Sequence, residues 1–312
     1  MCVPGGTYLV TRTALERRFL LRPSPVVNEV FTYCLFRSAA AHGVLVHAVC
    51  VESTHFHAVV TDTRGELSEF MRWLDRHTAL CLMEHYQQSH PHRQLEGIWS
   101  KQPFSATLLL TPDAIVDKIV YTLTNPVKDG LVHDYRKWPG VMSRPGDWLR
   151  PVRYARRPKL YFDDDDEEHR EVPASISIPV QCKDRTPEAF VRDVEAAIRE
   201  VQRGAAATRS AEGRDVMGHK AVTRQDPFDA PGSRRPRYTL NPRLAAGGNH
   251  DAMRQGIAAL RLFREKYRAA WRMYQRQLEV VFPAGTYLMR RLHQVCCEPI
   301  DTPWCCRCVP SG

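Results

Sequence analysis

The sequence has no apolar run long enough to cross a bilayer. Its N-terminus also lacks the succession of basic, apolar and small residues that marks a secretory signal peptide. Both absences argue against an integral membrane protein and against a secreted one. We therefore expect a cytoplasmic protein with no membrane partner.

Acidic residues are scarce outside one block of the chain. Residues 163–168 hold six of the 35 Asp and Glu, so the rest of the 312-residue sequence carries 44 Lys and Arg against 29 acids. The resulting net charge of +15 on that part favours a polyanionic partner and salt-dependent binding. The same charge also suits a protein that merely stays soluble, so it does not establish a nucleic-acid partner alone.

Strand and helix patterns alternate through the first 150 residues. Strands are expected at 7–11, 44–51, 55–61 and 105–110, and a helix is expected between the first and second strands and between the third and fourth. Ser24-Pro25 and Thr111-Pro112 each place an N-cap residue before a proline at the first helical position. The order β-α-β-β-α-β plus one more helix predicts an α+β, ferredoxin-like antiparallel sheet with helices on one face. The other face would stay open for a site.

The character of the chain changes near residue 150, and we expect a mostly helical C-terminal extension beyond it. Residues 1–150 would form one domain, 151–250 a charged linker with one short helix ending near Arg203, and 251–312 an amphipathic helix with a Cys-rich tail. The amphipathic helix places a row of arginines opposite its apolar stripe. It could lie on DNA or pack on the main domain with a solvated basic face, and packing is the favoured interpretation.

The triplet His55-Phe56-His57 lies in the third expected strand. Successive strand side chains point to opposite faces, so His55 and His57 share one face while Phe56 turns to the core. A His-x-His triplet is weak evidence by itself, because 13 His make about one such pair by chance. Two half-exposed histidines on a sheet face are the structural alternative to a metal site.

Tyr121 lies on the polar side of the helix that begins after Thr111. The apolar residues of this helix cluster on the opposite side, so a core tyrosine would point the other way. Tyr121 and Asn125 are four residues apart and share a face. Two imidazoles, an amide oxygen and a phenol can thus converge on one metal ion and one phosphodiester. The alternative is a surface tyrosine followed by a helix stop at Asn125-Pro126.

The segments Ser53-Thr54-His55-Phe56-His57 and 121–132 resemble the single-tyrosine HUH transposases of the insertion-sequence-200-like family. They are most similar to its REP-associated tyrosine transposase branch. The resemblance covers about residues 1 to 150 and implies the ferredoxin-like fold that the patterns predict independently. It also implies a metal-dependent transposase that cleaves and rejoins single-stranded DNA with hairpin ends through a 5′-phosphotyrosine intermediate.

The resemblance implies a role for each matching residue. Tyr121 would be the nucleophile, and His55 and His57 would ligate Mg²⁺ or Mn²⁺. Asn125 stands where the insertion-sequence branch commonly has a glutamine as third ligand, and Asp117 or Glu52 could replace it. Many family members are homodimers in which the tyrosine helix of one chain serves the histidines of the other. Plausible DNA-backbone contacts are Arg12, Arg17, Arg18, Lys101, Lys128 and Arg136, and Trp99 and Trp138 could stack on bases.

Two other functions stay open. One is a domesticated DNA-binding regulator that keeps the fold and does not cut, against which the intact His55, His57 and Tyr121 argue. The other is a replication initiator or relaxase-like nickase, which shares the histidine pair. The sequence shows no helicase motif and no further tyrosine motif of the kind those nickases carry.

Overall fold

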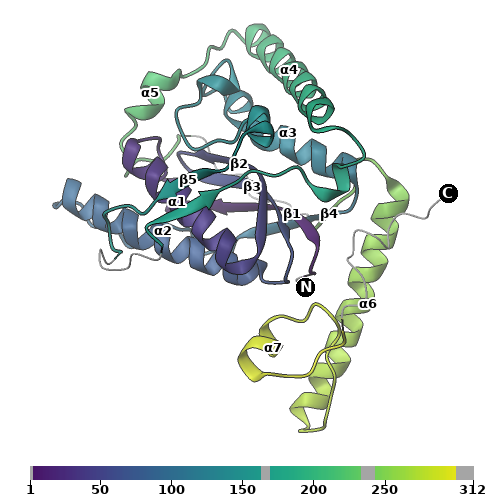
Figure 1. Cartoon of the computed structure of the whole chain (residues 1–312). Coiled ribbons are helices and arrows are strands. Elements are labelled where there is room, and N and C mark those ends of the chain that lie inside the picture. Colours follow the sequence, from purple (N-terminus) through teal and green to yellow (C-terminus); the bar gives the residue numbers. More distant parts are fainter. Residues whose placement is uncertain (1–2, 163–168, 233–242, 300–312) are drawn as a thin grey trace.

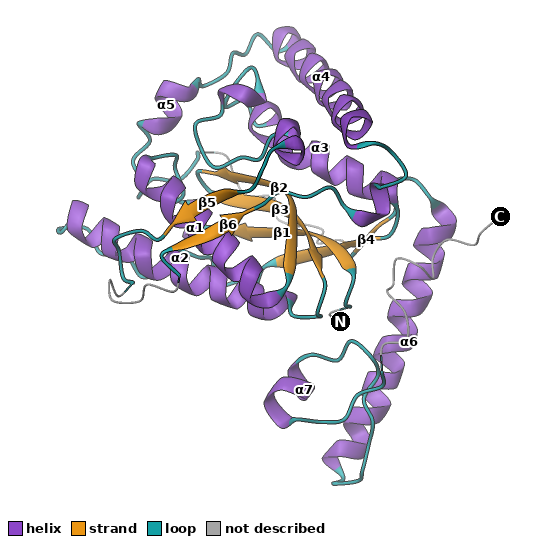
Figure 2. Ribbon diagram, in the orientation of Figure 1, coloured by secondary structure: helices purple, strands orange, loops and turns teal. Residues whose placement is uncertain are grey.

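A five-stranded sheet forms the centre of the molecule (Figures 1 and 2). The computed structural model describes residues 3–162, 169–232 and 243–299. The strand order is β2-β3-β1-β4-β7, and every neighbouring pair is antiparallel except β4 and β7. The strands are β1 (Gly6–Thr13), β2 (Val44–Glu52), β3 (His55–Asp62), β4 (Ser105–Leu109) and β7 (Leu244–Ala245).

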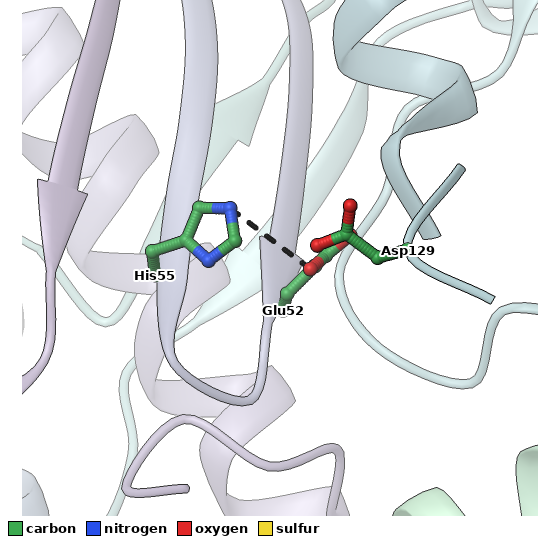
Figure 3. Close-up of side chains that lie close together, drawn as sticks. All are labelled: Glu52, His55 and Asp129. Carbon is green, nitrogen blue, oxygen red and sulfur yellow. Dashed lines mark ion pairs between the residues drawn. The ribbon is translucent and has the colours of Figure 1, made fainter. Parts of the chain in front are cut away.

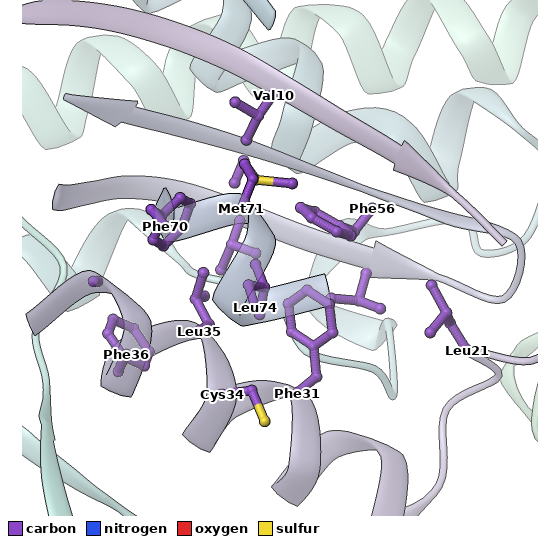
Figure 4. Close-up of a cluster of buried hydrophobic side chains, with 14 of the residues drawn as sticks. Val10, Leu21, Phe31, Cys34, Leu35, Phe36, Phe56, Phe70, Met71 and Leu74 are labelled. Atoms are coloured by element: carbon purple, nitrogen blue, oxygen red, sulfur yellow. The ribbon is translucent and has the colours of Figure 1, made fainter. Parts of the chain in front are cut away.

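Helices cover both faces of this sheet. Helices α1 (Pro25–His42) and α2 (Leu67–Ser89) pack on the face to which Phe56 points, and Figure 4 shows Phe31 and Phe70 buried there. Helix α3 (Pro112–Lys128) lies on the other face, and α4 (Pro187–Ala211) packs outside it. The α+β class with a mostly antiparallel sheet is confirmed. The expectation of one open face is wrong, because α3 has its own apolar stripe and buries it on the sheet.

The predicted helix starts are confirmed at atomic detail. Ser24 Oγ accepts a hydrogen bond from the Val27 amide at 3.2 Å, and Thr111 Oγ1 accepts one from the Ala114 amide at 3.1 Å. Helix α3 does not stop at Asn125-Pro126 and continues to Lys128.

The other helices and strands either follow residue 150 or lie in the connections between the elements named above. Short 3-10 turns form at Leu15–Arg17, Tyr135–Lys137, Pro145–Leu149 and Val180–Cys182. Strands β5 (Arg153–Arg156) and β6 (Glu171–Ala174) form a separate pair, and helices α5 (His219–Thr223), α6 (His250–Gln275) and α7 (Leu288–His293) complete the chain. The acidic block at 163–168 and the last cysteines of the tail lie outside the described residues.

The region 151–250 contributes to the core. Helix α4 passes through Gly204 to Ala211, well beyond the expected end near Arg203, and buries Phe190 against the α3 layer. Val222 of α5 is also buried there. The division of the chain into domains stays a prediction. None of the described helices combines the length and apolar character needed to cross a membrane.

Segments outside strands β1 to β4 cover both the β2 edge and the β4 edge of the sheet. At the β2 edge, the Val51 amide donates to the Val141 carbonyl at 2.9 Å and the Ser177 amide donates to the Val46 carbonyl at 3.0 Å. At the β4 edge, the Leu110 amide donates to the Ala245 carbonyl of β7 at 2.8 Å.

Helix α6 packs on the main body only through its first turns. Ala252 and Gly256 are buried there, and a Cβ atom at Gly256 would lie 2.6 Å from Cδ1 of Leu110, so glycine permits this close approach. The rest of α6 extends away from the sheet (Figure 1), and Phe282 and Met289 of the following segment pack on its apolar side. The favoured interpretation, packing on the main domain with a solvated basic face, thus holds for the first turns, and further along α6 packs against its own following segment.

Candidate active site

The two histidines of the triplet face α3. In the β2–β3 hairpin, His55 and His57 point away from the α1–α2 core, and their ring centroids are 4.8 Å apart. A threonine hydroxyl contacts Nδ1 of each ring, on the side away from α3. Thr54 Oγ1 lies 2.9 Å from Nδ1 of His55, and Thr11 Oγ1 lies 2.7 Å from Nδ1 of His57. Nε2 of each ring therefore faces the tyrosine helix.

Both imidazoles are neutral at physiological pH. Burial, together with the charge of Arg17, lowers the pKa of His55 to about 4. Burial also lowers the pKa of His57 well below its usual value. Neutral imidazole is the form that ligates metal ions.

Tyr121 lies beside these rings in the same chain. Its phenol oxygen is 3.5 Å from Nε2 of His57, and the two ring centroids are 5.1 Å apart. The Lys128 ammonium lies 4.7 Å from the centroid of the phenol ring. Burial, together with the charges of Asp129 and Glu52, raises the pKa of Tyr121. The resemblance implies that the tyrosine helix of one chain serves the histidines of another. In this structure Tyr121 already lies beside the histidines of its own chain.

An acidic pair completes the cluster (Figure 3). Glu52, His55 and Asp129 each offer one ligand atom, and these atoms all lie within 4.8 Å of one another. Burial raises the pKa of Glu52 well above its usual value, and the neighbouring Asp129 raises it further. Burial raises the pKa of Asp129 as well. Two carboxyl groups this close tend to share one proton when no cation lies between them.

The donor set fits a divalent cation. Carboxylate oxygens suit Mg²⁺ and Mn²⁺, and neutral imidazole nitrogens add affinity for Mn²⁺ and related metals. A cation would also relieve the repulsion within the acidic pair, because metal binding displaces the protons of its ligands.

Asn125 contacts the acidic pair through its amide nitrogen. Nδ2 donates to Oε1 of Glu52 at 2.9 Å and lies 3.2 Å from Nε2 of His55. In this arrangement Asn125 positions Glu52, and its role as a metal ligand stays a prediction. The alternative Asp117 is exposed about two helical turns before Asn125, whereas Glu52 lies at the centre of the cluster.

Sequence reasoning missed Asp129. It was overlooked because the helix was expected to end at Pro126. The available signal was its position four residues after Asn125, which places both residues on one side of a continued helix.

The proposed DNA-contact residues fall into two groups. Arg17 and Lys128 lie at the site, since each lowers the pKa of a site histidine. The others lie elsewhere: Arg18 pairs with Glu16 at 2.5 Å, Arg136 pairs with Asp134 at 2.6 Å, and Lys101 is exposed.

Arg12 and the two tryptophans have structural contacts. Arg12 is only 12% exposed, pairs with Asp75 at 2.8 Å and lies over the Trp99 ring. Trp138 is 3% exposed and donates to the Val51 carbonyl at 3.0 Å, so the expectation that it stacks on bases is wrong. Trp99 is partly buried and donates to the Asp75 carbonyl at 2.7 Å.

Comparison with known proteins adds little to this geometry. No protein-family model matches the sequence, and no curated protein matches it. One solved structure with some similarity is that of a REP-associated tyrosine transposase bound to a REP hairpin. Its TM-score is 0.39 and its sequence identity is 18%, over 57% of this chain and 95% of that chain. A similarity this weak does not assign the chain to that family.

Proposed function

We propose that this chain is a metal-dependent transposase that cleaves and rejoins single-stranded DNA with hairpin ends through a 5′-phosphotyrosine intermediate. The observation that carries the proposal is the position of the Tyr121 phenol oxygen, 3.5 Å from Nε2 of His57 and beside the acidic pair. Burying Glu52 beside two neutral histidines costs stability unless a ligand offsets the cost. A functional site explains why they are gathered beside a tyrosine.

Glu52, His55, His57 and Asp129 are the residues that would hold Mg²⁺ or Mn²⁺. Such an ion, when bound, polarises the scissile phosphate and offsets the charge that develops on it. Thr11 and Thr54 would fix the two rings, as hydrogen bonds to the far nitrogen commonly do for ligating histidines.

Tyr121 would supply the nucleophile. Attack forms a bond between its phenol oxygen and phosphorus and breaks the bond from phosphorus to the 3′ oxygen. Overall the phenol proton passes to that 3′ oxygen, so no water is consumed and a free 3′-hydroxyl is left. The Lys128 ammonium lies over the face of the phenol ring, 4.7 Å from its centroid, and attracts the ring in that position. Rejoining is the same exchange with a different 3′-hydroxyl.

A gel assay tests the proposal. The full chain is mixed with labelled single strands from the flanks of its gene, in Mn²⁺ or in EDTA, and separated in SDS. We expect a Mn²⁺-dependent covalent band for the wild type that is absent for Tyr121→Phe and reduced for His57→Ala. Tyr154→Phe is the matched control, because Tyr154 is 65% exposed and outside the site.

Each other outcome has a definite meaning. A covalent band that persists in Tyr121→Phe would remove the tyrosine from the mechanism. Tight DNA binding with no band in any condition would favour the non-cleaving regulator. Tyr121→Phe should bind DNA as the wild type does if the tyrosine acts only as nucleophile.

A further inference from the structure

Helix α6 presents a face of arginines to solvent. Arg261, Arg264, Arg268 and Arg272 follow one another at intervals of three and four residues, and all four are exposed. Such spacing aligns side chains along one side of a helix. The buried residues of α6, among them Ala252, Gly256 and Ala270, lie on the other side. We call the four arginines the α6 arginine face.

No ion pair neutralises the charge of this face among the residues that the structure describes. Helix α6 contains two acids, and one of them, Asp251, pairs with Arg254. The other is Glu265, and within the described part of the chain none of the four arginines forms an ion pair with it or with any other acid. Like charges one turn apart destabilise a helix. A polyanionic partner would offset this cost.

Helix α4 provides a contrast within the same molecule. Its exposed Arg199 lies 3.8 Å from Glu195, and Arg203 pairs with Glu200, so these arginines are neutralised by acids one turn away. A merely solvated helix surface has this composition. The α6 arginine face lacks such ion pairs among the described residues, although α4 and α6 are both long and amphipathic.

An aromatic side chain borders the arginine row, and its ring stacks on Tyr274 with the ring centroids 6.0 Å apart. Trp271 is 37% exposed and sits one turn after Arg268 and next to Arg272. Guanidinium groups bind phosphates, and an exposed indole can stack on an unpaired base. This combination suits a single-stranded or partly paired nucleic acid better than it suits an acidic protein.

We propose that the α6 arginine face binds the phosphate backbone of the DNA on which the chain acts, at a place remote from the scissile phosphate. The inference rests on the proposed function for the identity of the nucleic acid. The chain enters α6 beside the N-terminal end of α3, where Thr111 Oγ1 donates to the Ala246 carbonyl at 3.1 Å. Tyr121 lies about 15 Å further along α3, and α6 extends away from the sheet (Figure 1). The face therefore contacts DNA that flanks the cleaved position.

Equilibrium binding tests this proposal. The probe is a fluorescein-labelled single strand from one flank of the gene, and its anisotropy is followed over a series of KCl concentrations. The test variant is Arg261→Gln/Arg268→Gln/Arg272→Gln in the full chain. The control is Arg192→Gln/Arg199→Gln/Arg203→Gln, which removes the same charge from exposed positions of α4. Circular dichroism melts check that both variants fold.

We expect the α6 variant to bind at least about tenfold more weakly, with a salt slope reduced by about 2 for three lost phosphate contacts. The α4 control should stay within about twofold of the wild type, since its arginines make no phosphate contact. Arg261→Lys/Arg268→Lys/Arg272→Lys should retain most of the affinity, because lysine also binds phosphate.

Three results would overturn the proposal. Unchanged binding of the α6 variant would do so, and so would equal losses in the α6 and α4 variants, which would reveal only a general charge effect. Sedimentation with phosphatidylserine vesicles is measured in parallel, and a loss of binding confined to the vesicles would assign the face to a membrane surface. If the wild type forms no covalent band with any DNA, the proposed cleavage fails, but the anisotropy comparison still decides whether α6 binds DNA.

Discussion

The hydroxyl oxygen of Thr11 lies 2.7 Å from Nδ1 of His57, on the side of the ring that faces away from Tyr121. This contact joins β1 to β3 and fixes which nitrogen the imidazole presents to α3. His55 has the same arrangement with Thr54, at 2.9 Å. The site histidines are therefore oriented by hydroxyl groups that touch neither the tyrosine nor the acids.

Replacing Thr11 with valine should misorient His57 while preserving the shape of the side chain. We expect Thr11→Val to lower Mn²⁺ affinity, and with it the rate of covalent adduct formation, about tenfold. Thr11→Ser restores the hydroxyl and should restore the rate. The measurement is adduct formation against Mn²⁺ concentration, and a Val variant with wild-type behaviour would show that Thr11 does not position the ring.

Glu52→Gln should weaken the response of the protein to Mn²⁺. We expect Mn²⁺ to raise the melting temperature of the wild type and to stabilise the variant only at concentrations at least about tenfold higher. In EDTA the variant should be at least as stable as the wild type at neutral pH, because burial and Asp129 raise the pKa of Glu52 and its ionisation opposes folding. Glu96→Gln, at an exposed position, is the control. An unchanged Mn²⁺ response would exclude Glu52 as a ligand.

His47 should make the fold sensitive to acid. Its Nδ1 lies 2.7 Å from the Ser177 carbonyl, its Nε2 lies 2.7 Å from Oγ1 of Thr61, and burial lowers its pKa to about 4. The unfolded chain has a histidine pKa of about 6.5 and takes up a proton first. Stability present above that pH is therefore lost as the pH falls toward 4.

His47→Gln should flatten this dependence. The free energy of unfolding is measured with urea in EDTA between pH 4 and about 6.5. We expect its slope against pH to be smaller in the variant than in the wild type by about 1 kcal/mol per pH unit. His133→Gln, at an exposed position, should keep the wild-type slope. Equal slopes for His47→Gln and the wild type would mean that folding does not lower the pKa of His47.

Arg209 should stabilise the end of the tyrosine helix. It is buried, and its Nη1 donates to the Val127 carbonyl at 2.8 Å. Arg209→Met keeps much of the packing and removes one donor to that carbonyl, to which the Gly130 amide also donates at 3.2 Å. We therefore expect a loss of about 0.5–1.5 kcal/mol in the free energy of unfolding. Arg203→Met, on the exposed surface of the same helix, should change it by less than about 0.5 kcal/mol. Similar losses for both variants would argue against a specific capping role.

Local rules account for what the sequence could predict. The caps at Ser24 and Thr111, the shared face of His55 and His57, and the polar side of Tyr121 each depend on residues within one turn or one strand. The strand and helix order of the first half follows from the same short-range periodicities. These features were correct because neighbours along the chain determine them.

The features that the sequence did not predict depend on contacts between residues far apart along the chain. Helix α3 continues past Pro126 where Arg209, more than 80 positions later, binds its last turn, and this extension brings Asp129 to the site. Trp138 is buried because its indole reaches the Val51 carbonyl of β2. The two-residue strand β7 has no pattern of its own and exists only as a partner of β4.

The covered edges of the sheet have a consequence for any shortened form of the protein. Residues after 150 supply β7 at one edge and Ser177 at the other. A fragment that ends at residue 150 would therefore open backbone groups along β4 and, around Val46, on β2. Open strands of this kind act as templates on which further chains assemble. The predicted catalytic region alone would therefore be prone to aggregation, and the later half of the chain serves as its built-in protection.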